Sequence, residues 1–216
     1  MLIIIFTKII IYKAMSEEEK QKVIEVINKR KPEVRAWLDR NVWKDFGSDP
    51  SVGYKSWYVD EENGCRSIKS EIFIKRPMKE VVDYVFNNDN KTKYDHNLSE
   101  AKQIVNYDDT YDLFYFKYKG AFFIECRDFY VAAYHKIGED FSECFCTSYN
   151  DPKYGPIKKV TRAELTYAGW EFRKQDDGVL CTFYTLADLK LNQNLVNLKI
   201  GEIAQQAIYL KKILEK

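Results

Sequence analysis

The sequence lacks the features that mark a nucleic-acid-binding protein, a disulfide-stabilised domain or a structural zinc site. Its 216 residues carry 34 Lys and Arg against 33 Asp and Glu, and the two signs are interleaved. A nucleic-acid-binding surface would be basic and clustered, so no nucleic-acid partner is expected. The five cysteines are odd in number and follow no disulfide framework, which predicts reduced thiols and a cytoplasmic protein. Cys144 and Cys146 share a strand face, but no second pair of ligands completes a zinc site.

Catalytic signatures are also scarce. The only histidines are His96 and His135, and the sequence contains no nucleophile elbow, phosphate-binding loop or HExxH motif. His135 could act as a base inside a cyclase-like cavity, whereas a single histidine on a strand is more often structural. We therefore expect no catalytic residues, no metal and no cofactor.

No apolar run is long enough to cross a membrane. The first 15 residues, MLIIIFTKIIIYKAM, are apolar but are interrupted by Lys8 and Lys13, and a spanning helix needs about 20 apolar residues. The following SEEEK is typical of a helix start, with Ser16 as the cap. Residues 1–15 are then either an extension before a true start at Met15 or a weak membrane-surface anchor. Residues 16–216 are expected to form a single domain.

What the sequence does contain is a series of short strand patterns between helical ends. A helical pattern covers residues 16–45, with a break or restart at Pro32, and another helix opens at Pro77. Residues 194–216 are helical again. Strands are predicted at about 54–59, 65–74, 101–107, 111–118, 127–136, 141–148, 158–173 and 179–189. This order predicts an α+β fold, in which a curved antiparallel sheet buries its concave face against the last helix. A tunnel remains where that helix does not fill the concavity.

Aromatic residues are abundant, with 16 Tyr, 13 Phe and 4 Trp. Strand alternation along residues 113–119 places Phe114, Phe116 and Tyr118 on one face, while the intervening lysines face water. On the next strand one face carries Arg127, Phe129, Val131, Ala133 and His135. Both faces fit either an ordinary sheet core or the wall of a wide apolar cavity.

Four motifs occur in an order that resembles one known family. They are KYDHNL at residues 93–98, RDF at 127–129, VTRAELTYAGW at 160–170 and LVNLKIGEIAQQAIYLKKIL at 195–214. Over about residues 20–216 the sequence resembles the START family, the StAR-related lipid-transfer domains. It departs from the family at DLKLNQN, residues 188–194, where a turn containing Gly and Pro is usual. The resemblance implies the helix-grip fold, a curved antiparallel sheet wrapped around a long C-terminal helix with an internal lipid tunnel.

The resemblance also implies positions for a lipid headgroup. Lys91 and Asp95 stand where phosphatidylcholine-transfer members have a basic and an acidic residue near the headgroup, and a spacing of four places them on one helical face. A solvated surface pair is the alternative. Two of the three choline-cage positions hold Phe116 and Phe129, but the third holds Thr166, so the cage is incomplete. Ala133 replaces the buried arginine of cholesterol-binding members, which favours a phospholipid over a sterol. The expected tunnel lining is Phe114, Phe116, Tyr118, Phe129, Val131, Ala133 and Thr166.

The same resemblance identifies the segment GAFFIEC, residues 120–126, as a gate loop at the tunnel entrance. Its expected gate residues are Gly120, Phe122, Phe123 and Ile124, and its apolar tip would pack against the last helix or touch a bilayer. The expected lid-helix residues are Leu195, Leu198, Ala204, Ala207 and Ile208. Adjacent strand residues point to opposite faces, so Arg127 and Asp128 should each anchor a different partner. Arg162 is the third candidate for a structural ion pair.

The leading hypothesis is a non-enzymatic protein that binds one lipid molecule and transfers it between membranes. We expect a monomer that contacts membrane surfaces transiently. One alternative is a helix-grip enzyme, similar to a polyketide cyclase or an acyl hydrolase, which would need a titratable group deep in the cavity. The other is a lipid sensor that binds a partner protein and transfers nothing.

Overall fold

The computed structural model describes residues 2–120 and 124–216, with side chains from residue 16 onward except at 193–194 and 197–200. A long first helix, α1 (Leu2–Leu38), precedes three strands and two short helices, and the remaining strands and two helices follow. In chain order these are β1 (Lys44–Asp49), β2 (Tyr54–Asp60), β3 (Arg66–Ile74), α2 (Met78–Phe86), α3 (Asn88–Tyr94), β4 (Leu98–Asn106), β5 (Tyr111–Tyr118), β6 (Cys126–Lys136), β7 (Phe141–Ser148), β8 (Val160–Arg162), β9 (Glu164–Gln175), β10 (Gly178–Asp188), α4 (Gln193–Ala204) and α5 (Gln206–Leu214).

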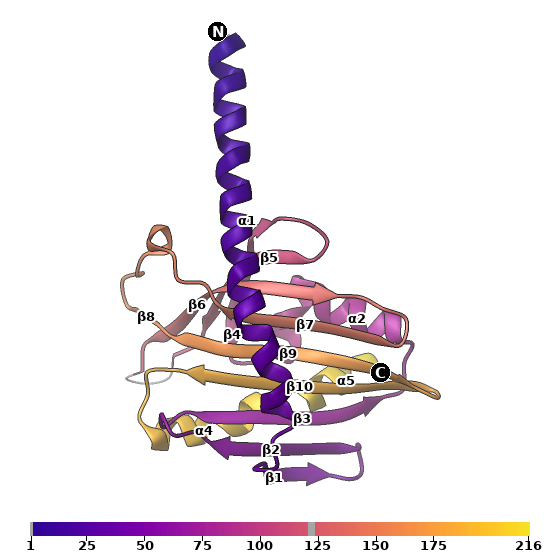
Figure 1. Ribbon diagram of the computed structural model, residues 1–216. Coiled ribbons are helices and arrows are strands. Elements are labelled where there is room, and N and C mark those ends of the chain that lie inside the picture. The colour runs from indigo at the N-terminus through magenta and orange to yellow at the C-terminus, as the bar shows by residue number, and fades with distance from the viewer. Residues whose placement is uncertain (1, 121–123) are drawn as a thin grey trace.

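The strands form one curved, open sheet (Figure 1). Its order is β1-β2-β3-β10-β9-β7-β6-β5-β4, with antiparallel neighbours throughout, and the short β8 pairs in parallel with β6. The last strand, β10, lies between β3 and β9 and so joins the two halves of the chain. This architecture confirms the predicted α+β helix-grip fold.

Helix α1 packs on one face of the sheet. Its buried residues Val23, Ile27, Val34, Trp37 and Leu38 recur at helical spacing and form a core with residues of β5, β6, β7, β9 and β10. Beyond the sheet the helix projects away from the body of the molecule (Figure 1). No helix in the described part of the chain is both long and apolar enough to cross a membrane.

Two predictions about this helix were wrong. Pro32 does not break it, and Ser16 is not its cap, because α1 runs without interruption from Leu2 to Leu38. Proline within a helix removes one backbone hydrogen bond. Here Ile27 and Val34, on either side of Pro32, both pack on the same sheet, and this burial holds the two parts of the helix in line.

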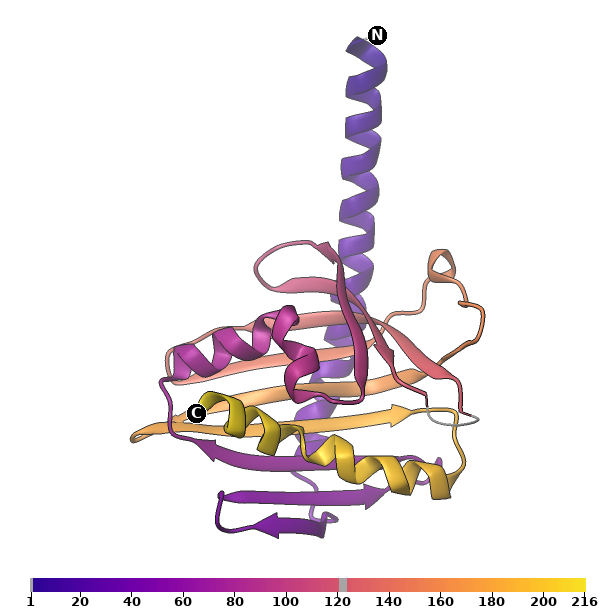
Figure 2. The same ribbon diagram turned by 180° about the vertical axis from the view of Figure 1, so that it is seen from behind.

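The remaining helices cover the opposite, concave face (Figure 2). Helices α2 and α5 bury their apolar sides there against β3, β9 and β10. The predicted single C-terminal helix is divided at Gln205 into α4 and α5. The Tyr54 hydroxyl donates a 3.0 Å hydrogen bond to the carbonyl oxygen of Ala204 at this break, which gives that carbonyl a partner from the sheet. Asn192 caps α4 by accepting the N–H of Leu195.

Candidate functional site

A cavity of about 770 Å³ lies between the concave face of the sheet and the helices that cover it. Strands β4 to β7, β9 and β10 form its wall, and α2 and α3 form its other side. From the C-terminal helices, Ile203 and Gln206 reach it. The sequence predicts such a cavity, because a tunnel remains wherever the last helix does not fill the concave face of the curved sheet.

Rings from two neighbouring strands form much of the apolar wall. Phe114, Phe116 and Tyr118 of β5 border the cavity, as do Phe129 and Ala133 of β6. The rings of Phe114 and Phe116 stack at 5.7 Å, and Tyr118 meets Phe129 edge-on at 5.6 Å. These side chains share one face because they alternate along paired strands.

Two expected lining residues do not reach the cavity. Val131 has the predicted orientation, but neighbouring side chains cover it completely, and it belongs to the core beneath the wall. Thr166 is the extra residue of a β-bulge: Leu165 pairs with Ala187 and Tyr167 pairs with Leu186, so Thr166 has no partner on β10. The bulge shifts the alternation along β9 and removes Thr166 from the wall.

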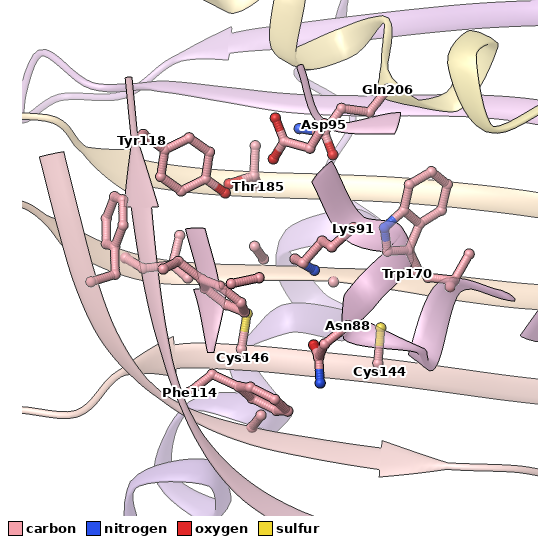
Figure 3. Close-up of a pocket in the computed structure, with 18 of the residues that line it drawn as sticks. Asn88, Lys91, Asp95, Phe114, Tyr118, Cys144, Cys146, Trp170, Thr185 and Gln206 are labelled. Carbon is pink, nitrogen blue, oxygen red and sulfur yellow. The ribbon is translucent and has the colours of Figure 1, made fainter. Parts of the chain in front are cut away.

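Lys91 projects from α3 into the cavity (Figure 3). Its ammonium lies 5.0 Å from the ring centroid of Phe116, and within the described residues it has no ion-pair or hydrogen-bond partner. Burial alone would lower the pKa of this ammonium, but the acidic side chains around it, Tyr94 and Asp95 among them, outweigh burial and raise the pKa above its usual value. Lys91 is therefore a charged group in a largely apolar cavity.

Asp95 follows α3 by one residue and is only 2% exposed. Its carboxylate accepts the N–H of Asn97 at 3.3 Å, and Tyr118, Thr185 and Gln206 gather around it (Figure 3). Burial raises the pKa of this carboxyl, while Lys91 and hydrogen bonding from Tyr118 act in the opposite direction. Thr185 and Gln206 come from β10 and α5, and no sequence motif pointed to them.

The thiols of Cys144 and Cys146 also face the cavity (Figure 3). Burial raises the pKa of both thiols, that of Cys146 to about 12, and nearby Lys91 only partly opposes this effect. Both groups are therefore neutral thiols at physiological pH and poor nucleophiles.

A second polar cluster borders the cavity near the far end of β6. His135 Nδ1 lies 3.3 Å from Asp112 Oδ2, and the buried Asp112 also accepts hydrogen bonds from Gln103 at 2.7 Å and Asn106 at 2.8 Å. The sequence indicates His135 as a candidate base, but its carboxylate neighbour Asp112 was not predicted. Asp112 stands two residues before Phe114 on β5, and residues two apart on a strand point to the same face of the sheet. This spacing could have placed Asp112 on the cavity face.

At the expected gate the structure describes Gly120 and Ile124, whereas Phe122 and Phe123 lie outside the described residues. Ile124 borders the cavity. Arg127 donates hydrogen bonds to the carbonyl oxygens of Leu189, Glu125 and Lys190, at 3.0, 2.6 and 3.3 Å. It thus ties the end of the gate segment to the loop that precedes α4.

The expected lid residues that the structure describes lie on or near the buried side of the C-terminal helices. Ala204 packs in a small core with Ile68 and Val196, and Ala207 packs in the main core beneath α5. Leu195 and Ile208 are partly buried and do not border the cavity, and the side chain of Leu198 lies outside the described residues.

No protein-family model matches the sequence, and no curated protein matches it. Solved structures do match. Human StAR-related lipid transfer protein 5 aligns with a TM-score of 0.75 at 19% identity, over 94% of this chain and 98% of that one. Human STARD10 aligns with a TM-score of 0.70 at 19% identity, over 84% and 78%. A STAR-related lipid transfer protein from Xanthomonas axonopodis aligns with a TM-score of 0.66 at 16% identity, over 82% and 100%.

These similarities establish the fold class. The chain has the START helix-grip fold, as the sequence motifs predicted, and it covers nearly the whole of the human domain to which it aligns over 98% of that domain's length. At identities below 20% the likeness is one of architecture. Function must therefore be argued from the cavity itself.

Proposed function

We propose that the protein binds a single lipid molecule in this cavity and carries it between membranes. The observation that carries the proposal is a large cavity with an aromatic wall, into which Lys91 places an ammonium with no partner among the described residues. An apolar wall with a few convergent polar groups is typical of a small-molecule site. The aligned human and bacterial proteins are named as lipid-transfer proteins, which supports the same interpretation.

The driving force for loading is burial of hydrocarbon. Each methylene moved from water into the cavity contributes about 0.8 kcal/mol, so a lipid cannot cross water freely. The entrance must therefore open at a membrane surface, which makes the membrane contact transient. The segment between Gly120 and Ile124 is the proposed gate. We place the protein in the cytoplasm as a monomer.

Within the lipids, the polar groups favour a phospholipid over a sterol. Lys91 and Asp95 are ionisable groups that border the cavity. A sterol would offer them one hydroxyl and would leave buried charges uncompensated, which is costly. A phosphate supplies the counter-charge that Lys91 lacks.

We propose a carrier without catalytic activity, because the cavity thiols are held neutral by burial. The paired His135 and Asp112 favour a second candidate, a helix-grip enzyme. A carboxylate oxygen 3.3 Å from Nδ1 is placed to orient an imidazole for proton transfer. Conversion of a bound substrate by the wild-type protein, lost in His135→Asn, would support this enzyme.

The test of the carrier is transfer of a fluorescent phospholipid between two liposome populations. The wild-type protein should accelerate transfer, and Lys91→Gln should weaken lipid binding by about 1.5–3 kcal/mol, as expected for a lost charged hydrogen bond. Lys93→Gln changes an exposed lysine on the same helix and should have little effect. Stable loading without transfer would indicate the sensor instead. No loading at all would contradict the proposal.

A further inference from the structure

The loop between β7 and β8, residues 149–159, lies at the edge of the molecule that carries the proposed gate. The strand that follows it, β8, pairs in parallel with the start of β6, with Val160 opposite Cys126, the last residue of the gate segment. The hydroxyl of Thr161 donates a 3.1 Å hydrogen bond to the carboxylate of Glu125 in that segment. In Figure 2 the loop, drawn in orange, projects beyond the sheet. A surface that approaches the gate therefore approaches this loop as well.

The tip of this loop, residues 155–159, combines an exposed apolar side chain with two free charges. All five of its residues are exposed. Ile157 is 41% exposed and is one of only four exposed large apolar side chains in the described part of the chain, so its position is unusual for this protein. Lys158 and Lys159 follow it, and neither ammonium has an ion-pair or hydrogen-bond partner within the described residues.

The turn at the tip places both lysines at its apex at a conformational cost. The N–H of Val160 donates a 3.1 Å hydrogen bond to the carbonyl of Ile157, so Lys158 and Lys159 are the two central residues of a tight turn. Lys159 has a φ of 61°, in the left-handed region that glycine or asparagine adopts more readily. A strained backbone where glycine would be unstrained indicates a function for the side chain that stands there.

The base of the loop is held to the body of the protein. Arg162 donates hydrogen bonds to the carbonyl oxygens of Tyr154 and Gly155, at 2.9 and 3.4 Å. The ring of Tyr154 stacks on Tyr130 with centroids 4.5 Å apart, and its hydroxyl donates a 3.0 Å hydrogen bond to Glu19 of α1. The exposure of the tip is therefore built into the fold and does not result from a loose connection.

We propose that this tip is a docking surface for an anionic membrane. The inference rests on the proposed function, because it gives the gate a fixed point of contact with the bilayer. The isoleucine enters the headgroup region while the two ammonium groups contact lipid phosphates and carboxylates. Each basic residue near an anionic surface strengthens binding about fivefold. The net charge of the whole chain is only +1, so a local site must supply this attraction.

A protein partner fits the tip less well. A specific protein interface takes about 20–30 residues on each side, far more than a turn of five residues presents. Lysine is also depleted from such interfaces relative to the rest of a protein surface. A bilayer requires no matching shape, and its anionic headgroups supply the charge that complements two adjacent lysines.

The test is sedimentation of the protein with vesicles of phosphatidylcholine, prepared with and without phosphatidylserine. The wild-type protein should bind the vesicles that contain phosphatidylserine more tightly, and added salt should weaken this binding. Lys158→Gln/Lys159→Gln should weaken it about twentyfold. The matched control is Lys55→Gln/Lys136→Gln, which removes the same charge from two exposed lysines on β2 and at the opposite end of β6 from the gate, and it should have little effect.

Lys159→Gly separates the function of the side chain from its effect on stability. Glycine adopts a positive φ without strain, so this variant should melt at the wild-type temperature or above it. It should nevertheless bind the anionic vesicles about fivefold more weakly. Unchanged binding in Lys159→Gly would contradict a role for this lysine in docking.

The outcomes separate this inference from the lipid carrier. Vesicle binding that is absent, is independent of phosphatidylserine, or is equally weakened in the control would overturn the docking surface and favour a protein partner for the tip, while transfer of lipid would leave the carrier intact. Binding to anionic vesicles that requires the tip, in a protein that takes up no lipid, would support the docking surface and contradict the carrier. A melting curve of each variant verifies that folded proteins are compared.

Discussion

Arg162 neutralises the buried carboxylate of Asp128 through two hydrogen bonds, from Nε to Oδ1 at 2.8 Å and from Nη2 to Oδ2 at 3.1 Å. Asp128 is 1% exposed, and the guanidinium also lies 4.8 Å from the ring centroid of Tyr130. The pair joins β8 to β6 immediately after the gate segment. Asp128 thus has a bidentate charged partner, whereas Lys91 in the cavity has no ion-pair partner among the described residues.

Removing only the arginine should therefore be costly. We expect Arg162→Met to lower the free energy of unfolding by about 3 kcal/mol, because it leaves a buried carboxylate without its partner. The double variant Arg162→Met/Asp128→Leu should recover most of that loss, since no buried charge remains. Urea unfolding of both variants measures the difference. A single variant as stable as the wild type would show that the pair contributes nothing.

Phe116 and Phe172 offer a comparison between a cavity wall and an ordinary core. Both are buried, at 5% and 0% exposure, but Phe172 packs in the core beneath α2 and α5 and does not border the cavity. Phe172→Ala should cost about 3–5 kcal/mol of stability. Phe116→Ala should cost about 2 kcal/mol or less, because part of that ring faces open space.

The effect on lipid affinity should be larger for Phe116→Ala than for the core variant, which is the reverse of the order expected for stability. Phe116→Ala should weaken lipid affinity, since the ring borders the cavity and faces the Lys91 ammonium. Melting curves with and without lipid measure both effects. If Phe116→Ala destabilised the protein as much as Phe172→Ala and left lipid affinity unchanged, the Phe116 ring would belong to the ordinary core.

Asp95 should make the stability of the lipid-free protein depend on pH. Burial raises the pKa of this carboxyl in the folded state, whereas the unfolded value is about 3.9. The folded protein therefore binds the proton more tightly, and stability is lost as the pH rises from about 3.9 through the folded pKa. Asp95→Asn should melt higher than the wild type at pH 7, by about 2–4 °C per kcal/mol relieved. The gap should close below about pH 3.9, and a variant that melts lower at pH 7 would contradict this account.

Gly120 lies where two segments of backbone approach closely at the base of the gate. A Cβ at this position would overlap the carbonyl oxygen of Ile124, so Gly120→Ala must displace the segment that follows. We expect slower transfer between liposomes with little change in the melting temperature. Gly47→Ala is a matched control, because its Cβ would meet only Ser56 Oγ at 3.8 Å. Unchanged transfer in Gly120→Ala would exclude a gating role for this geometry.

Much of the sheet follows from alternation in the sequence. The strands at 111–118 and 141–148 were predicted to the residue, because one face of each is apolar and turn residues bound them. Strand β1 was missed, since all six of its residues are exposed and no alternation marks an exposed edge strand. The bulge at Thr166 was missed for a related reason. One extra residue in a strand shifts the following side chains to the other face of the sheet, and the amino-acid composition of the strand gives no sign of it.

The site was predictable only in part. The resemblance to the START family selected Lys91 and Asp95, and their spacing of four predicts that they share one helical face. Whether their side chains pair depends on side-chain directions that the sequence pattern does not give. Gln206 is the first residue of α5 and borders the same cavity as Asp95, although 111 positions separate them in the sequence. Contacts between segments more than 100 residues apart arise from the assembled fold and leave no local signal.

Native mass spectrometry of the purified protein tests the central claim, that the cavity holds one lipid, most directly. After expression, or after incubation with mixed phospholipid vesicles, the account predicts a species heavier than the chain by the mass of one phospholipid. The occupancy should be one per chain and should fall in Lys91→Gln but not in Lys93→Gln. A protein that stays bare under both conditions, and takes up no lipid from a broad panel, would contradict the account.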